Sequence, residues 1–468
     1  MTTIRIERRQ HAVGQGGFHS GRFQIQNALG SQTQTKTSAA EEGLPAGTLN
    51  YVYDCWSEQF QALTVALGSY RRVSRGHTNI LFVSQIHSAH LIGIDRLQAM
   101  APARIVVVPY LDVIDLSMLA LAETDKGHGS CALIEYVKDP IAWWRSRGAN
   151  SIIFIEPDDG SLCSKDENKF DSASIEQDQV VASSLFQPEL RFRTCFSPPQ
   201  GIVPDNLIAA SPEQQSCPEA AVLAGRNSAF YVEQRPHCNA TWSAVDWSLR
   251  PYVHQPPQAV RASFRREVGI FMGFRRASLD HVRKVVINAL HSSDRASQLI
   301  HRLWPIEKLN AIISMSLYSG PYVPESMKAE LSSRRSWLSV QGPLQNTMYV
   351  AAGWLSTGWT NLSDDATLEP WKAHYASVAA QIGYLCLPAH GAVQNFHEDL
   401  LSFNNLVVGV IVSSSHNIEN KDVRLTIEYM RCGGAKVIVV DEHWSSELTV
   451  SYINSQSQSL ISDKAEPQ

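Results

Sequence analysis

One segment, residues 79–97 (NILFVSQIHSAHLIGIDRL), constrains the fold more than any other part of the chain. It opens with a short apolar and β-branched run at residues 80–83, which predicts a buried strand. Residues 84–90 are too polar to continue a core strand, and apolar side chains then return at helical spacing from Leu91. The segment therefore predicts a strand, a polar turn that carries His87 and His90, and the start of a helix. In α/β proteins, ligands bind beyond the carboxyl ends of such strands.

The alternation of strands and helices continues on both sides of this segment. Strands are expected at residues 3–10, 51–55, 104–109, 151–155, 309–318, 347–352, 384–387, 407–412 and 436–440. Helices are expected at residues 57–75, 113–123, 278–304, 371–382 and 424–430, and after the Asp139-Pro140 pair. Alternation of this kind indicates a layered α/β core.

Several short motifs lie where these strands end. A glycine-rich turn, VGQG at residues 13–16, follows the first strand, and glycine there permits positive φ. The other motifs are YVYDC at residues 51–55, QIHSAH at 85–90, STGW at 356–359 and PAHG at 388–391. In this order they resemble the signature segments of the metallo-β-lactamase superfamily of metallohydrolases, and most closely its competence-type, nucleic-acid-processing branch. The resemblance covers about residues 10–155 and 305–440.

The resemblance implies a four-layer αββα sandwich and a site for two metal ions. Active members hold the metals with an H-x-H-x-D-H turn, a T-G-D motif and a P-H-H-G motif, and the metals lower the pKa of a bound water. By matching position, three ligand-type residues remain in this chain: His87, His90 and His390. The degenerate ligand positions hold Gln85, Ala89, Trp359 and Ala389. In addition, Trp56 stands where the family usually has glycine.

The losses leave no carboxylate at a matched ligand position, so nothing there offsets the charge of two dications. Trp359 brings an indole, which donates a hydrogen bond but does not bind a cation, into the place of a bridging aspartate. We therefore expect no cofactor, or at most one weakly bound zinc on His87, His90 and His390, in a drier and more apolar pocket. The three histidines alternatively remain as hydrogen-bonded side chains in a refilled pocket. His128 and His416 are further candidates for a replacement ligand, and exposed loop positions are the alternative for both.

The domain organisation follows from where the pattern breaks. Residues 1–156 and 305–445 are expected to form two halves of one metallo-β-lactamase-like core. Residues 157–304 form an inserted region, partly irregular and then helical, because they are rich in Pro, Ser, Gln and Asp. Within it, residues 160–240 are expected to be less ordered than the core, since their apolar content is low. Residues 446–468 form a polar tail.

Composition limits the partners. The net charge is −5, too mild to indicate a polyanion or an anionic membrane, so the Arg pairs such as Arg71/Arg72 are interpreted as solvated surface and nucleic acid remains an unsupported partner. The eight cysteines form no C-x-x-C pair, which argues against a zinc finger. We find no apolar run long enough to span a membrane and no apolar segment of a signal peptide at the start. A cytoplasmic protein is expected.

Three functions are compatible with these residues. The first is a catalytically inactive pseudoenzyme that acts as a scaffold or subunit, with a protein partner or a second copy of itself. The second is a residual metal-dependent hydrolase, a phosphodiesterase or nuclease, that uses His87, His90 and His390. The third is a non-catalytic module that binds a nucleotide or a peptide in the old cleft. We expect the first, and metal content distinguishes it from the second.

Overall fold

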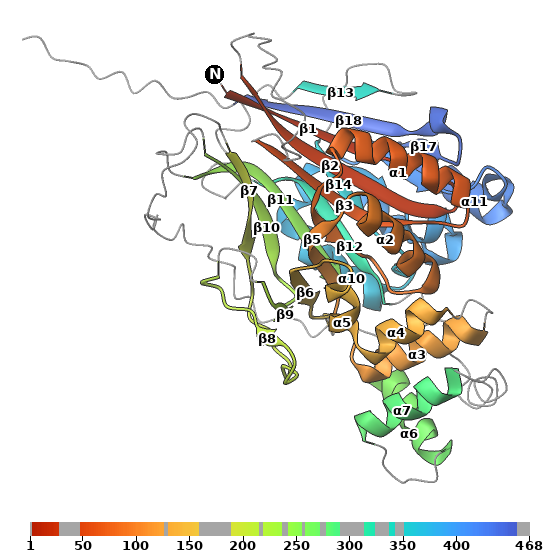
Figure 1. The fold of residues 1–468 in the computed structure, drawn as a ribbon. Helices are drawn as coiled ribbons and strands as arrows, with labels where there is room; N and C mark the ends of the chain where they lie inside the picture. Colours follow the sequence, from red (N-terminus) through yellow and green to blue (C-terminus); the bar gives the residue numbers. More distant parts are fainter. Residues whose placement is uncertain are drawn as a thin grey trace, which may run out of the picture.

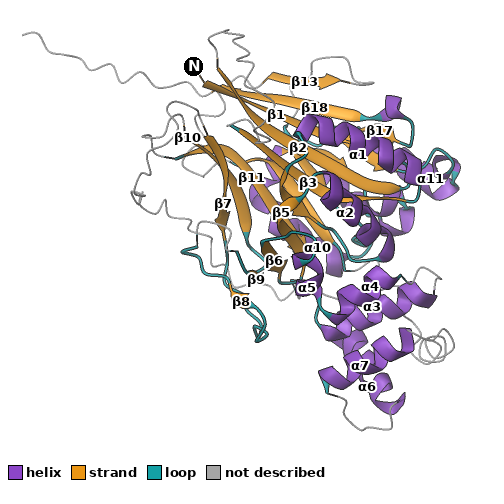
Figure 2. Cartoon of the chain, in the orientation of Figure 1, coloured by secondary structure: helices purple, strands orange, loops and turns teal. Residues whose placement is uncertain are grey.

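The computed structural model describes residues 2–27, 47–125, 130–158, 189–214, 219–235, 242–254, 258–271, 278–290, 313–322, 337–341 and 351–455. In these residues the protein is of the α/β class, with helices and two mixed β-sheets (Figures 1 and 2). The predicted fold class is therefore confirmed at this level. No helix in the described residues is both long and apolar enough to cross a membrane.

The first sheet carries the predicted strand, turn and helix. Its strands follow the order β13 (Trp337–Gln341), β18 (Leu448–Ser455), β1 (Thr2–Gln10), β2 (Gly16–Asn27), β3 (Thr48–Ser57), β4 (Thr78–Phe82), β5 (Ala103–Pro109), β6 (Ser151–Ile155), β9 (Ala221–Ala224) and β8 (Ile208–Ala209). Pairing is antiparallel from β13 to β3 and parallel from β3 to β8. Because β3 and β4 are parallel neighbours, their carboxyl ends lie together at one edge.

The second sheet supplies the other half of the pocket described below. Its order is β17 (Lys436–Val440), β16 (Val408–Val412), β15 (Ile382–Cys386), β14 (Gly353–Ser356), β12 (Met315–Pro321), β11 (Ser243–Val253), β10 (Ala229–Arg235) and β7 (Glu189–Cys195). The first four are parallel neighbours, and the remaining pairs are antiparallel. The expected motifs at residues 357–359 and 388–391 follow β14 and β15 directly.

Helices lie outside the sheets. They are α1 (Phe60–Ser74), α2 (Ser88–Met100), α3 (Val113–Asp125), α4 (Cys131–Lys138), α5 (Pro140–Arg145), α6 (Gln258–Phe271), α7 (Leu279–Leu290), α10 (Asp365–Tyr375) and α11 (Lys421–Cys432). Short 3-10 turns are η3 (Ala376–Gln381), η4 (Pro388–Gly391), η5 (Val393–Asn395), η6 (Glu398–Ser402), η7 (Asn417–Glu419) and η8 (Trp444–Ser446). Helices α1 and α2 pack on β3, α11 packs on β17, and α3, α4, α6 and α7 contact one another in a group beside the sheets (Figure 1).

The two sheets contact each other through a buried layer that centres on Arg8. Its side chain is buried, Nη1 donates to the carbonyl of Ser319 at 2.9 Å, and the guanidinium lies 5.3 Å from the ring centroid of Trp247. The Tyr51 hydroxyl, on the first sheet, donates to Ser319 Oγ on the second at 2.8 Å. Arg8 Nη1, Tyr51 and Ser319 of this layer are therefore hydrogen-bonded across the two sheets, as buried polar groups usually are.

The described parts of residues 189–253, within the expected insertion, form strands β7 to β11 where the sequence predicts a partly irregular region. These strands belong to the two sheets. Phe230 and Val232 of β10 are fully buried. The sequence pattern did not indicate these strands, because β7 (ELRFRTC) alternates apolar residues with arginines and because β9 is short. The division into domains and the expected lower order of residues 160–240 stay predictions, since much of that range lies outside the described residues.

Two further segments differ from the sequence-based expectation. The polar tail expected from residue 446 onward begins with β18, which pairs with β1 and buries Leu448 and Val450. Apolar and polar residues alternate in β18, so the mean apolar content of the segment is low and the sequence indicates a polar tail. Most of the strand expected at residues 347–352 lies outside the described residues, and the described strand, β14, begins at Gly353.

Candidate functional site

Three histidines that are far apart in sequence meet at the carboxyl ends of β4 and β15. His87 caps the N-terminus of α2, His90 lies in its first turn, and His390 lies in η4 after β15. Ring contacts of Trp56, at the end of β3, join all three. The three histidines therefore lie close together, as the sequence predicts.

A glycine in α2 makes this approach feasible. A Cβ atom added at Gly93 would lie 1.8 Å from the backbone oxygen of Cys55 in β3. Real side chains do not approach backbone so closely, so only glycine permits α2 to pack this tightly on β3. Close packing in turn holds the turn with His87 and His90 against the end of β3.

The indole of Trp56 occupies the centre of the three imidazoles. It stacks on His90 with ring centroids 4.7 Å apart, and it meets His87 and His390 edge to face at 5.2 and 5.6 Å. Trp56 is 3% exposed. Trp359, which we expected to fill the pocket, contacts His390 at 5.1 Å and Trp56 at 6.0 Å. Two indoles rather than one thus fill the pocket, and Trp56 is the more central.

Hydrogen bonds define the tautomers of His87 and His90. The backbone N–H of Ala89 donates to His87 Nδ1 at 3.2 Å, so this nitrogen carries no proton. His87 is therefore neutral and protonated at Nε2, which donates to His90 Nδ1 at 2.7 Å. His90 then carries its proton on Nε2, which faces Ser84 Oγ at 3.5 Å and Asp54 Oδ1 at 3.6 Å. Burial, followed by the charge of His390, lowers the pKa of His90 well below its ordinary value.

A hydrogen bond to the backbone of the neighbouring parallel strand, β16, holds His390 in place. Its Nδ1 donates to the carbonyl of Val412 at 2.7 Å, which leaves the lone pair on Nε2. This Nε2 is buried and has no hydrogen-bond partner within the described residues. Burial lowers the pKa of His390 to about 4, against the opposing effects of the Val412 hydrogen bond and the charge of Asp54. His390 is therefore neutral at pH 7.

A carboxylate that the matched ligand positions lack is supplied by Asp54. It has φ of 57° at a register shift between β2 and β3, an uncommon conformation that Asp tolerates better than most residues. Its Oδ1 accepts a hydrogen bond from the backbone N–H of Ser84 at 2.6 Å. Burial raises its pKa to about 7, opposed by the Ser84 hydrogen bonds and the charge of His390. Asp54 is part of the YVYDC motif, but nothing in the sequence indicates that its carboxylate lies near His90.

The space that remains beside these side chains is small. A cavity of about 40 Å³ is lined by Asp54, Trp56, Trp359, Cys386 and His390, among others. That volume holds a few water molecules. Pockets for drug-sized or nucleotide-sized ligands are about 300–1,000 Å³, so this cavity has no room for such a ligand in this conformation.

The residues present do not fit a two-metal centre. Two nitrogens bound to one tetrahedral zinc at about 2.0–2.1 Å each lie about 3.3 Å apart, whereas His87 Nε2 and His90 Nδ1 are 2.7 Å apart and share a proton. Both lone pairs of this histidine pair accept hydrogen bonds, and only His390 Nε2 is left with an unused one. Within the described residues, no three His, Cys, Asp or Glu side chains are grouped in a way that could hold a metal ion.

The structure places the four residues at the expected ligand positions in strand-end turns and at the start of α2. Gln85 is buried in the turn before α2. Ala89 lies in the first turn of α2, and its backbone N–H donates a hydrogen bond to His87 Nδ1. The backbone N–H of Trp359 donates to Ser314 Oγ at 3.0 Å. Ala389 and His390 both have positive φ, of 44° and 60°.

Of the two other candidate histidines, the structure describes only His416. His416 precedes η7 and is not among the residues that line the cavity. His128 lies outside the described residues. The set that the structure brings together is therefore the three histidines, Trp56, Trp359 and Asp54. No protein-family model matches this chain, and no curated protein matches its sequence.

Proposed function

We propose that the chain adopts the four-layer αββα sandwich of the metallo-β-lactamase superfamily and is a member whose metal pocket has lost its catalytic role. It acts as a scaffold or subunit, with another protein or a second copy of itself as partner. The two sheets in contact, the helices outside them and the strand-end position of His87, His90 and His390 support the scaffold.

One observation carries the functional part of the proposal: the indole of Trp56 contacts all three imidazoles and, together with Trp359, fills the space beside them. The hydrogen bonds of the pocket agree with it. His87 and His90 are hydrogen-bonded to each other, and His390 Nδ1 donates to the Val412 carbonyl, so of the three imidazoles His390 alone keeps a lone pair without a partner in the described residues.

A residual single-metal hydrolase is the competing function, and two observations favour it over a nucleotide- or peptide-binding module. The buried Nε2 of His390 has an unused lone pair, and the Asp54 carboxylate lies on the same cavity. A binding module would need far more than the 40 Å³ that the cavity offers. The hydrolase requires the Trp56 indole to leave and the His87–His90 hydrogen bond to break.

Metal content and turnover of the full chain decide between these functions. The protein is purified without a metal-binding tag, dialysed against zinc and then against buffer, and its metal content is measured by elemental analysis. The proposal predicts far less than one zinc per chain and no hydrolysis of bis-p-nitrophenyl phosphate above a heat-denatured control. Two metals per chain with phosphodiester hydrolysis at enzyme-like rates would overturn it, and one metal with such hydrolysis would establish the competing function.

A further inference from the structure

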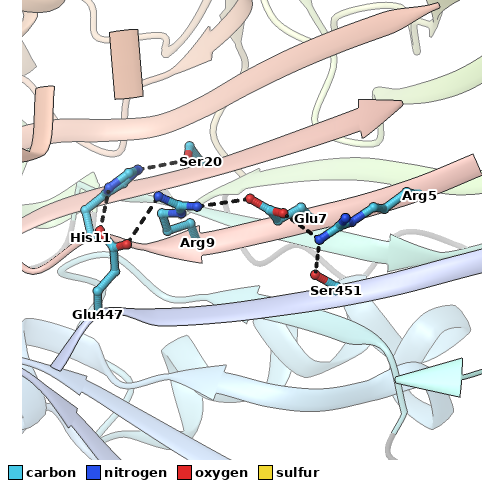
Figure 3. A network of polar contacts seen from close by, with 7 residues as sticks. All are labelled: Arg5, Glu7, Arg9, His11, Ser20, Glu447 and Ser451. Atoms are coloured by element: carbon cyan, nitrogen blue, oxygen red, sulfur yellow. Dashed lines mark hydrogen bonds and ion pairs between the residues drawn. The ribbon is translucent and has the colours of Figure 1, made fainter. Parts of the chain in front are cut away.

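A second group of chemically competent side chains lies apart from the histidine pocket, where β1, β2 and β18 meet. His11 follows β1, Ser20 is in β2, and Glu447 directly precedes β18 (Figure 3). His11 Nε2 lies 2.9 Å from Ser20 Oγ, and His11 Nδ1 lies 3.2 Å from Glu447 Oε2. A hydroxyl, an imidazole and a carboxylate are thus joined in one line through the two nitrogens of the ring.

The hydrogen bonds give His11 the tautomer that a general base needs. A carboxylate only accepts, so the proton of neutral His11 lies on Nδ1, and the Nε2 lone pair accepts from the Ser20 hydroxyl. Although burial acts to raise the pKa of Glu447, the hydrogen bond from His11 and the charges of His11 and Arg9 lower it below the ordinary value, which keeps it ionised. His11 itself is 1% exposed and stacks on Phe18 with ring centroids 4.1 Å apart, so the ring is held in place.

Ser20 and a neighbouring cation share a small cavity. Ser20 is 8% exposed and lines a cavity of about 10 Å³ together with His11, Arg22 and Asn50. Arg22 is two residues further along β2, so its side chain is on the same face of the sheet as Ser20. Its Nε is a buried donor without a hydrogen-bond acceptor in the described part of the chain. A buried, unused N–H on the residue that shares a cavity with a hydroxyl paired with a base is the kind of donor that stabilises an oxyanion.

We propose that Ser20, His11 and Glu447 form a serine acyl-transfer centre, with Arg22 placed to stabilise the oxyanion, that hydrolyses esters of small carboxylic acids. The nucleophile, base and orienting carboxylate match the geometric roles of such triads, which are recognised by geometry rather than by sequence order. The enclosed space is about the size of one water molecule, so a short acyl group such as acetyl requires the least displacement of the lining side chains beside Ser20. The alcohol part of the ester lies toward solvent.

The reaction balances with water as the only co-reactant. Ser20 Oγ attacks the ester carbonyl carbon and its proton passes to His11 Nε2, while the carbonyl oxygen becomes an oxyanion beside Arg22. The carbon–oxygen bond to the alcohol breaks, and His11 returns the proton to the leaving alkoxide. Water then attacks the acylated Ser20 by the same route, which releases the carboxylic acid and restores the hydroxyl. Glu447 is a positioning residue, because in the described residues its carboxylate pairs with His11 and Arg9 and not with Ser20.

The centre does not depend on the proposed function, because none of its residues lines the histidine pocket or contacts His87, His90 or His390. The full chain is incubated with p-nitrophenyl acetate, release of p-nitrophenolate is followed, and the acid-quenched protein is mapped by peptide mass spectrometry. We expect one acetyl group per chain on Ser20. In Ser20→Ala, both the acetylated peptide and the enzymatic release should be lost.

Matched variants separate chemistry from folding. Ser451→Ala removes another hydroxyl of the same polar network, one that accepts from Arg5 at 3.5 Å, and should leave the rate unchanged (Figure 3). His11→Asn should lower the acylation rate about 10²–10⁴-fold, the usual contribution of a general base. Thermal unfolding of each variant shows that it is folded. Should His11→Asn not fold, Glu447→Gln, at a side chain that is 25% exposed, provides the second test.

The pH profile distinguishes a positioning role of Glu447 from a merely structural one. Burial lowers the pKa of His11, and the groups that face it are Glu447, Arg9 and Tyr70, with Glu7 and Arg22 on the same cavity. Loss of the Glu447 charge should shift the midpoint of the wild-type rate profile further toward low pH and lower the plateau. The proposal is overturned if folded wild type carries no acetyl on Ser20, if Ser20→Ala retains the rate, or if His11→Asn and Glu447→Gln both leave the rate and its pH profile unchanged.

Discussion

The indole of Trp56 stacks on the imidazole of His90, with centroids 4.7 Å apart and ring planes inclined by 27°. The same indole contacts His87 and His390, so one side chain takes the centre of the pocket. By the family resemblance this position holds glycine. If the proposed family membership holds, the absence of metal ligands and the filling of the pocket are two separate changes, and restoring one does not restore the other.

This separation predicts how the pocket responds to reversion. In the variant Gln85→His, Ala89→Asp, Trp359→Asp, Ala389→His, the ligand set is complete but Trp56 remains. We expect little metal in this variant, and about one to two metal ions per chain when Trp56→Gly is added. The reason is steric, since an indole and a bridged metal pair cannot share the space.

Elemental analysis after purification without a metal-binding tag measures the outcome. Trp56→Gly alone is the control, and it should be destabilised by about 3–5 kcal/mol because a buried indole is removed. Urea unfolding therefore accompanies each measurement. If the four-fold variant already carries two metals with Trp56 in place, the indole does not block the pocket.

Asp54 predicts an unusual pH dependence of stability. Its folded pKa, about 7, is raised above the ordinary value, so its stabilising contribution is full below pH 4 and is lost as pH rises to 7. His390 has a folded pKa of about 4, below the ordinary 6.5, so its contribution is full above pH 6.5 and is lost as pH falls to 4. The two effects oppose each other between pH 4 and 6.5, and the wild-type stability should be nearly flat there.

The variant Asp54→Asn removes the contribution of Asp54 to the pH dependence of the free energy of unfolding and leaves that of His390. Asn still accepts from the Ser84 N–H and tolerates positive φ, so the variant should fold. Its free energy of unfolding relative to wild type should rise by on the order of 1 kcal/mol per pH unit from pH 4 to 7. Urea unfolding at pH 4.5, 5.5, 6.5 and 7.5 gives the comparison. A constant difference between the two proteins across this range would show that the Asp54 carboxyl titrates normally.

Arg8 predicts that charge is dispensable between the sheets whereas volume is not. Burial lowers the pKa of its guanidinium, and Nη2 has no hydrogen-bond partner among the described residues. Arg8→Met keeps the volume and removes a buried charge, so the free energy of unfolding should change by less than about 1.5 kcal/mol or increase. Arg8→Ala should lower it by about 2–5 kcal/mol, because a cavity remains. Equal losses in both variants, measured by urea unfolding, would instead assign the stabilisation to the Arg8 charge.

Much of the pocket could be predicted from the sequence because its residues follow strands. Residues 80–82 of the predicted strand lie in β4, which ends at Phe82, and the turn and helix with His87 and His90 follow as expected. His390 follows β15 in the same way. The strand-end rule therefore brought three distant histidines together without any knowledge of their contacts.

The contacts inside the pocket could not be predicted. The central place of Trp56 depends on its rotamer and on a register shift between β2 and β3, which no local pattern records. The His87–His90 hydrogen bond is likewise a matter of side-chain geometry. The group of Ser20, His11 and Glu447 joins residues 436 positions apart, and Glu447 was interpreted as part of a polar tail. Long-range strand pairing, here between β1 and β18, decides such groups, and the sequence offers no local signal for it.

The pairing of β18 predicts that the segment after residue 447 is part of the core rather than a tail. Val450, 1% exposed, lies opposite Arg8 in β1, so its side chain contributes to the buried layer. Val450→Asp would bury an unpaired carboxylate and should lower the free energy of unfolding by at least about 3 kcal/mol. The matched variant Thr449→Asp, on the other face of β18 and opposite Arg9, should change it by less than about 1 kcal/mol. Urea unfolding of both variants decides the matter. If Val450→Asp is as stable as Thr449→Asp, the segment does not pair with β1 in solution and the placement of Glu447 beside His11 fails with it.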